Sequence, residues 1–413
     1  MGTSLFPPET ARAYHEPMMG RLSHCALRAT RDTPRGRSRL GARFAVIAAG
    51  LALLGAGCAA EPALPPPGGV YRSDDGGITF VQKVLVTTGR TLARAEFRQG
   101  EIVPRVPGTL FAVTDEGLYV TRDAGNSWSR TSLPASSVFT VSVHPRNPQI
   151  LLAGGTGLTT RTAGSTFKSV DGGRAWTEVF QAPPAEEETG TIVRRRRSVP
   201  SVVTTIAHDP RTPEVVFAGT STGALVVSDD GGIHWQRRAS VQQGITGLKL
   251  SPTVSGRLVL RLTDGTLVRS ADGGRTIDRI DVRRTGRNGQ SEELPSGFGT
   301  AVDQAQAVLF AAPAGSTEPL FVGARSGLYR SDDGGVSWTQ IRLPTSLQPS
   351  SPITHIAQSA DGALWVAAGP VLLSSHDGGI TWRSVTLPGL GLPLRFVLAD
   401  PTEPKRLYLF FAR

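Results

Sequence analysis

The octet SDDGGVSW, Ser331 to Trp338, combines two acidic residues with two glycines and a tryptophan. Such a stretch reads as a compact acidic site, yet it also has the residues that a tight turn between two strands requires. Six related octets occur in the same chain: SDDGGITF (Ser73–Phe80), TRDAGNSW (Thr121–Trp128), SVDGGRAW (Ser169–Trp176), SDDGGIHW (Ser228–Trp235), SADGGRTI (Ser270–Ile277) and SHDGGITW (Ser375–Trp382). Seven copies of one motif indicate an array of repeated structural units.

The spacing of the octets matches one propeller blade per copy. The aspartates at the third position are Asp75, Asp123, Asp171, Asp230, Asp272, Asp333 and Asp377, with separations of 48, 48, 59, 42, 61 and 44 residues. Blades of this class have a period of about 50 residues. Between residues 201 and 238, short β-branched runs alternate with Gly, Pro and Asp turns, and this pattern predicts four antiparallel strands, the content of one blade.

The two ends of the chain decide how the array closes. Only GGVYRS precedes the first octet and ITFVQKVL follows it, so two strands are missing from that unit. The chain ends in LPLRFVLADPTEPKRLYLFFAR, which reads as two strands around a DPTEP turn. We therefore predict an all-β, seven-bladed β-propeller over residues 68–413. Its C-terminal strands pair with its N-terminal strands in one mixed blade, leaving no open sheet edge.

The octets resemble the BNR or Asp-box repeat of sialidases, sortilin-type sorting receptors, xyloglucan-degrading glycosidases and photosystem-II assembly propellers. The resemblance implies that each octet is a turn between the third and fourth strands, away from the ligand face. The residues support a structural role on their own: the glycines permit positive φ and the aspartate can accept amide hydrogen bonds. A calcium loop needs a different pattern of acids, so we expect the seven aspartates to be structural and no metal to bind.

The N-terminal segment has the features of an export signal. Arg35, Arg37, Arg39 and Arg43 precede an apolar run over residues 44–57, which is too short to span a bilayer comfortably. The run ends in LGAGC and resembles a bacterial lipobox with Cys58 as the lipidated residue, although Leu54 lies one position further back than usual. We expect a leader over 1–57, a Pro-rich spacer over 58–67, and a lipoprotein on the extracytoplasmic side of the cell membrane. The alternative is an ordinary cleaved signal or a tethering helix.

Charge and cysteine content exclude several functional classes. Half of the net charge of +10 lies in residues 1–57, which hold eight Arg and three acidic residues. The remainder lacks the concentrated basic stripe of a nucleic-acid-binding protein. Cys25 and Cys58 are the only cysteines, too few for a disulfide framework or a zinc cluster. We expect no cofactor.

Two long inserted segments carry the candidate binding residues. Residues 181–200 and 282–299 account for the two widest octet separations, and they contain the arginines Arg194, Arg195, Arg196, Arg197, Arg283, Arg284 and Arg287. Arginines from two blades could hold an acidic sugar, a phosphate headgroup or an acidic protein segment on the loop-rich face. The alternative is that these are solvated loops whose opposite charges pair locally.

The sequence favours binding over catalysis. A sialidase would need a Phe-Arg-Ile-Pro motif, and the nearest match is Pro104-Arg105-Val106-Pro107, while Tyr71, Tyr119, Tyr329 and Tyr408 read as packing residues. Another glycosidase would need two carboxylates at a fixed separation. The candidates are the loop acids Asp115, Glu116, Asp264, Glu292, Glu293 and Asp303. We therefore expect a non-catalytic binding or assembly scaffold for a protein or glycan, with a cell-surface glycoside hydrolase as the alternative.

Overall fold

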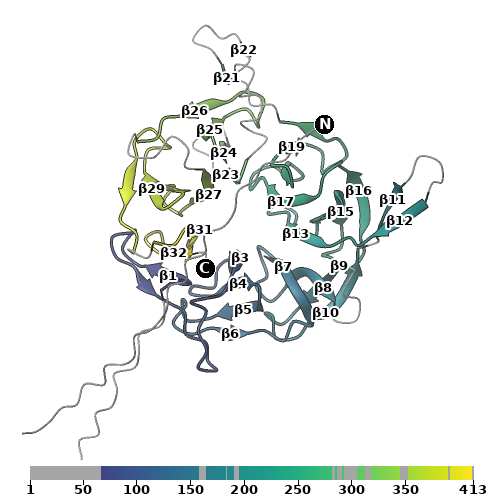
Figure 1. Ribbon diagram of the computed structural model, residues 1–413, viewed down its shortest axis with the longest axis horizontal. Coiled ribbons are helices and arrows are strands. Elements are labelled where there is room, and N and C mark those ends of the chain that lie inside the picture. Colours follow the sequence, from purple (N-terminus) through teal and green to yellow (C-terminus); the bar gives the residue numbers. More distant parts are fainter. Residues whose placement is uncertain are drawn as a thin grey trace, which may run out of the picture. The chain divides into compact units, whose positions relative to one another are not determined.

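The computed structural model describes residues 67–157, 164–182, 184–189, 195–280, 284–285, 291–292, 305–311, 318–344, 352–388 and 391–411. They form seven four-stranded antiparallel sheets arranged as the blades of a seven-bladed β-propeller, which confirms the predicted fold (Figure 1). The leader, Cys58 and residues 58–66 of the spacer lie outside the described residues. Within the described ranges, no helix is long and apolar enough to cross a membrane.

The strands follow the chain blade by blade. Blade 1 contains β3 (Phe97–Ile102), β4 (Leu110–Thr114), β5 (Gly117–Thr121) and β6 (Ser129–Arg130). Blade 2 contains β7 (Ala135–Val143), β8 (Leu151–Gly157), β9 (Gly164–Ser169) and β10 (Thr177–Gln181). Blade 3 contains β13 (Val203–His208), β14 (Val216–Thr220), β15 (Ala224–Ser228) and β16 (Gln236–Ser240).

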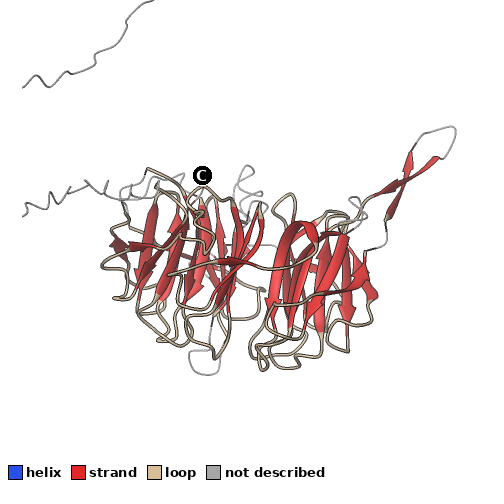
Figure 2. Cartoon of the chain, turned by 90° about the horizontal axis from the view of Figure 1, so that it is seen from below, coloured by secondary structure: helices blue, strands red, loops and turns tan. Residues whose placement is uncertain are grey.

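The second half of the ring repeats this order. Blade 4 contains β17 (Ile245–Leu250), β18 (Leu258–Leu262), β19 (Leu267–Ser270) and β20 (Asp278–Arg279). Blade 5 contains β23 (Ala307–Phe310), β24 (Leu320–Ala324), β25 (Gly327–Ser331) and β26 (Thr339–Ile341). Blade 6 contains β27 (Ile353–Gln358), β28 (Leu364–Ala368), β29 (Val371–Ser375) and β30 (Arg383–Val385). The strands run between the two faces of the ring (Figure 2).

Blade 7 is built from both ends of the chain, as predicted. Its order is β2 (Val81–Gln82), β1 (Val70–Ser73), β32 (Leu407–Phe411) and β31 (Leu394–Ala399). β1 and β32 are antiparallel, with Val70 opposite Phe410 and Ser73 opposite Leu407. The ring therefore closes through backbone pairing of two segments more than 300 residues apart in the sequence.

Alternate side chains of β32 fill the cores on both sides of blade 7. Tyr408 and Phe410 belong to the core shared with blade 1. Leu407, Leu409 and Phe411 belong to the core shared with blade 6. The run LYLFF is apolar throughout because a strand sandwiched between two sheets buries both of its faces.

Small residues in the second strands allow adjacent blades to pack closely. A Cβ on Gly219 of β14 would lie 2.5 Å from Ile245 Cγ2 of blade 4, and one on Gly323 of β24 would lie 2.3 Å from Ile353 Cγ2 of blade 6. Both distances are shorter than a carbon–carbon contact allows. Glycine at these positions lets the first strand of the next blade approach.

Each octet is a turn held by one serine or threonine and one aspartate. In SDDGGVSW the Ser331 hydroxyl donates to Asp333 Oδ1 at 2.7 Å and accepts the Gly335 amide at 2.8 Å. Asp333 Oδ1 also accepts the amides of Val336 and Ser337, both at 2.9 Å. Partial burial acts to raise the pKa of Asp333, but the hydrogen bonds from Ser337 and Ser331 outweigh it and hold that pKa at about 2.

The same arrangement recurs around the ring. In all seven octets the hydroxyl donates to the aspartate, a glycine amide donates to the hydroxyl, and the amide of the fourth residue after the aspartate donates to the carboxylate. The seven aspartates are Asp75, Asp123, Asp171, Asp230, Asp272, Asp333 and Asp377. The octets thus connect the third and fourth strand of each blade with their carboxylates already engaged by the turn itself.

We predict that Asp333→Ala lowers the free energy of unfolding by about 1–3 kcal/mol, because the backbone amides that donate to the carboxylate lose their acceptor. The matched control is Asp332→Ala, whose carboxylate makes an exposed ion pair with Arg330 at 2.8 Å and should contribute at most about 1 kcal/mol. Because the pKa of Asp333 lies below the unfolded value of about 3.9, the difference should be complete above pH ~4 and shrink as the pH falls towards 2. Urea unfolding at pH 7 and pH 3 measures it. Equal losses in both variants would contradict the assignment.

Candidate functional site in the central channel

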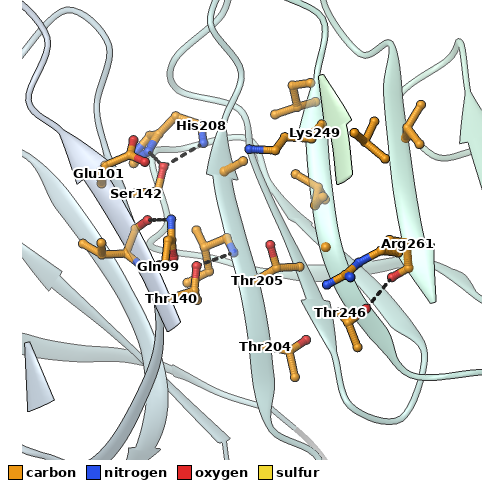
Figure 3. Close-up of a pocket in the computed structure, with 18 of the residues that line it drawn as sticks. Gln99, Glu101, Thr140, Ser142, Thr204, Thr205, His208, Thr246, Lys249 and Arg261 are labelled. Carbon is orange, nitrogen blue, oxygen red and sulfur yellow. Dashed lines mark hydrogen bonds between the residues drawn. The ribbon is translucent and has the colours of Figure 1, made fainter. Parts of the chain in front are cut away.

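The first strand of each blade lines the centre of the ring. β3, β7, β13, β17, β23, β27 and β31 each contact the first strand of the next blade, and Figure 1 shows them innermost. A cavity of about 450 Å³ lies between them, lined by residues from six of these strands and from β18 (Figure 3). Pockets for small molecules typically measure about 300–1,000 Å³.

A β-bulge recurs near the start of the first strand. In six blades the register with the second strand shifts by one residue, and the extra residues are Arg98, Phe139, Thr204, Thr246, Thr354 and Arg395. A bulge turns a side chain out of the regular alternation of its strand. The cavity lining includes Arg98, Phe139, Thr204 and Thr246.

The residue after the bulge often ties two blades together. Gln99 donates to the Val141 carbonyl at 2.8 Å and accepts the Val141 amide at 3.0 Å. One blade further, the Thr140 hydroxyl accepts the Ile206 amide at 3.2 Å. First strands are edge strands of their sheets, so their outward N–H and C=O groups would otherwise have no partner in the protein. These side chains supply one.

The described lining of the cavity has three cations and one carboxylate as its charged groups: Arg98, Lys249, Arg261 and Glu101. Arg98 donates to the Val138 carbonyl at 3.0 Å and lies 4.8 Å above the centre of the Phe139 ring. Arg261 donates to the Gln306 carbonyl at 3.3 Å. Glu101 and Lys249 extend into the cavity from opposite sides (Figure 3). Among the described residues, no carboxylate lies within ion-pair distance of any of the three cations.

Burial shifts the pKa values of titratable side chains in the cavity wall. It raises the pKa of Glu101 to about 7, against the opposing effects of Lys249, the Val143 amide and Gln99. Burial also lowers the pKa of His208 and of His355 to about 3, with nearby cationic groups adding to the effect. At neutral pH both imidazoles are therefore uncharged and Glu101 is only partly ionised, so the cavity is positively charged.

A serine–histidine contact in the wall is structural. Ser142 Oγ lies 2.9 Å from His208 Nδ1 and accepts the His208 backbone amide at 3.2 Å. Both side chains are buried, and the His144 ring packs edge-on against His208 at 5.5 Å. Since Ser142 already accepts a backbone N–H, this pair links blades 2 and 3 rather than presenting a nucleophile. Sequence reasoning missed the contact, although His144 and His208 both precede a Pro turn in neighbouring units.

The two arginine-rich segments contain hairpins where we expected loops. β11 (Ala185–Thr189) pairs with β12 (Arg195–Val199), and β21 (Arg284–Thr285) pairs with β22 (Ser291–Glu292). The register places Glu187 opposite Arg197 and Glu188 opposite Arg196.

The hairpins lie at the outside of the ring in Figure 1, and neither contributes to the described lining of the central cavity. Arg194, Arg283 and Arg287 lie outside the described residues, and β12 and β21 are described here by their backbone alone. The binding role of the seven arginines therefore stays a prediction.

The described lining of the cavity includes none of the three candidate glycosidase carboxylates whose side chains are described, Asp115, Glu116 and Asp264. Asp115 accepts the Glu96 amide at 3.0 Å, between the segments that flank β3 and β4, and Asp264 accepts the Thr266 amide at 2.9 Å within a turn. Glu116 accepts the Tyr119 hydroxyl at 3.1 Å. Glu292 lies in β22, and Glu293 and Asp303 lie outside the described residues. The four tyrosines considered for a sialidase are buried in the core: Tyr71, Tyr119, Tyr329 and Tyr408.

Comparison with known proteins agrees with this architecture. The family model described as Sortilin, neurotensin receptor 3 matches residues 68–183. A search of curated proteins finds no significant match. The solved structure of YCF48 bound to D1 peptide has a TM-score of 0.55 at 18% identity, covering 77% of this chain and 93% of that chain. YCF48 from Cyanidioschyzon merolae gives a TM-score of 0.54 at 15% identity, covering 77% and 96%.

The chain is a seven-bladed β-propeller whose blades carry turns of the BNR, or Asp-box, type. The GH74 xyloglucanase from Xanthomonas campestris shares the fold with a TM-score of 0.54 at 15% identity, covering 82% of this chain. This Asp-box propeller spans 52% of the length of that enzyme. At these identities the likeness establishes the fold, and the site must be argued from the residues of this chain.

We predict that Gln99→Met lowers the free energy of unfolding by about 1–3 kcal/mol, because it leaves the N–H and C=O of Val141 without their partner at similar side-chain volume. Gln236→Met is the control, since Gln236 is exposed and its side-chain amide donates to the Asp229 carboxylate at 3.1 Å; this change should cost within about 0.5 kcal/mol. Chemical unfolding of the three proteins compares them. A loss in Gln99→Met no larger than in Gln236→Met would show that the inter-blade bridge contributes nothing.

Proposed function

We propose that this Asp-box propeller is an exported, lipid-anchored scaffold that binds a protein or glycan partner without catalysis. The arginines of the two inserted segments hold the partner at the loop-rich face, and the cationic central cavity can hold an acidic group. A lipid on Cys58 anchors the protein to the extracytoplasmic side of the membrane. Nucleic acid is not a partner in this proposal.

The charge of the central cavity is the observation that carries the proposal. Its described lining has Arg98, Lys249 and Arg261 against the single carboxylate Glu101. Glycoside hydrolysis by the usual mechanism needs two carboxylates flanking the bond, about 5–10 Å apart. A cationic cavity with one carboxylate is better suited to holding an acidic group than to cleaving a glycosidic bond.

The similarity to YCF48 in complex with D1 peptide supports a protein partner, because a propeller of the same fold binds a peptide. The similarity to the xyloglucanase supports the second candidate, a cell-surface glycosidase. The export and anchoring parts rest on the sequence of the leader, in which four arginines precede the apolar run that ends at Cys58.

We predict that changing Arg194–Arg197 together to Ser lowers partner recovery at least tenfold in a pull-down from host membranes, because charge-assisted hydrogen bonds to an acidic partner are lost. The matched control changes Glu186–Glu188 to Ser on the opposing strand, which should leave recovery unchanged or raise it. Unchanged recovery in the arginine variant would remove the hairpin from the proposal. Turnover of chromogenic glycosides that is abolished by Glu101→Gln or by a loop-acid substitution would overturn the non-catalytic role.

A further inference from the structure

Blade 4 differs from its neighbours where the first two strands face the channel. In blades 2 and 3 the second strand has a glycine opposite the residue that follows the bulge, namely Gly154 and Gly219. In blade 5 Gly323 of the second strand lies opposite Ala307, the first residue of β23. In blade 4 the glycine is on the first strand instead, and Gly247 lies opposite Arg261. Relative to blades 2 and 3, the glycine and the larger residue of this pair have exchanged strands.

This exchange places the arginine over the glycine. A Cβ on Gly247 would lie 3.4 Å from both Cβ and Nε of Arg261, so the arginine side chain packs directly over the glycine. Gly247 does not have the left-handed backbone conformation that would itself require glycine. The lack of a side chain at position 247 leaves room for Arg261, whose guanidinium lies at the cavity in Figure 3.

Lys249 joins Arg261 on the same side of the sheet. Lys249 pairs with Val259 and Gly247 pairs with Arg261, so Lys249 and Arg261 are diagonal neighbours. Diagonal positions are about 7–8 Å apart and lie within reach of long side chains. Thr246, the bulge residue of the same strand, also lines the cavity and adds a hydroxyl.

Of the cavity cations, Arg261 and Lys249 are the two available to bind a ligand. Arg98 is already stacked on Phe139 and bonded to Val138, whereas Arg261 donates, among the described residues, to one carbonyl, that of Gln306. Burial lowers the pKa of Arg261, which shows that its charge is disfavoured where it stands. A partly buried cation with no carboxylate partner is costly unless an anion compensates it.

We infer that the central cavity binds a small molecule bearing an oxyanion, a carboxylate or a phosphate, and that Arg261 and Lys249 hold that oxyanion. This inference rests on the proposed binding role and names the ligand chemistry of its channel. The volume of about 450 Å³ suits a ligand of monosaccharide size with room for water. The guanidinium can form two parallel hydrogen bonds to the oxyanion, and the ammonium adds a point charge.

Isothermal titration calorimetry with three probes tests the inference: inorganic phosphate, glucuronate and neutral glucose. We expect phosphate, glucuronate or both to bind at one per chain, and glucose not to bind. A preference between the two anions identifies the oxyanion. Arg261→Gln and Lys249→Met should each weaken binding at least tenfold. Arg383→Gln, on the outer strand β30, should bind like the wild type.

Lys249 is exposed, so Lys249→Met keeps the inference falsifiable if Arg261→Gln fails to fold. The inference is overturned if the wild type binds neither anion, if binding survives both cavity substitutions, or if only an acidic peptide binds. Partner recovery by a wild type that binds no small anion would overturn this inference alone. Loss of partner recovery together with undiminished anion binding would overturn the proposed scaffold role alone.

Discussion

The pairing of β1 with β32 is the constraint on which the rest of the molecule depends. Each blade packs only against its two neighbours, so a ring with an unjoined blade would have two open ends. Here the join is made by backbone pairing, by Arg406 binding Asp74 at 2.8 Å, and by the Phe411 amide donating to the Gly69 carbonyl at 3.0 Å.

Aromatic packing adds to this join from the inside. Phe410 stacks on Phe396 with ring centres 4.4 Å apart and meets Phe97 of blade 1 edge-on at 5.1 Å. Aromatic pairs of this kind are stabilising by about 0.5–1.5 kcal/mol beyond the burial of their area. The C-terminal strand thus packs blade 7 against blade 1.

The site follows from closure because its groups come from strands that meet only in the closed ring. Glu101 belongs to blade 1 and Lys249 to blade 4, and they extend towards one cavity only when the first strands form a complete inner wall. The bulges turn side chains into the channel, and bridges such as the one from Gln99 to Val141 hold successive edges in place. Rigidity of the wall lets a few charges act at fixed positions.

The sequence predicted the fold well because its signals are local. The Asp-Gly-Gly turns, the Pro-bounded turns and the apolar run LYLFF each specify a short segment, and their spacing sets the blade count. The cavity residues were not predicted, since Arg98, Glu101, Lys249 and Arg261 become neighbours only through a bulge or a cross-strand pairing. A signal for one of them was present: ITGLKL has glycine where the corresponding strand VTTIAH has threonine.

Native-state hydrogen exchange of β1 and β32 tests the central claim most directly. If the ring closes through their pairing, the amides of Leu407–Phe411 and Val70–Ser73 should exchange only through global unfolding. Their opening free energy and denaturant dependence would then match those of β14 in the continuous blade 3. Exchange of β1 and β32 at a clearly lower free energy, while β14 stays protected, would show that the ring stands without this join and would contradict the account.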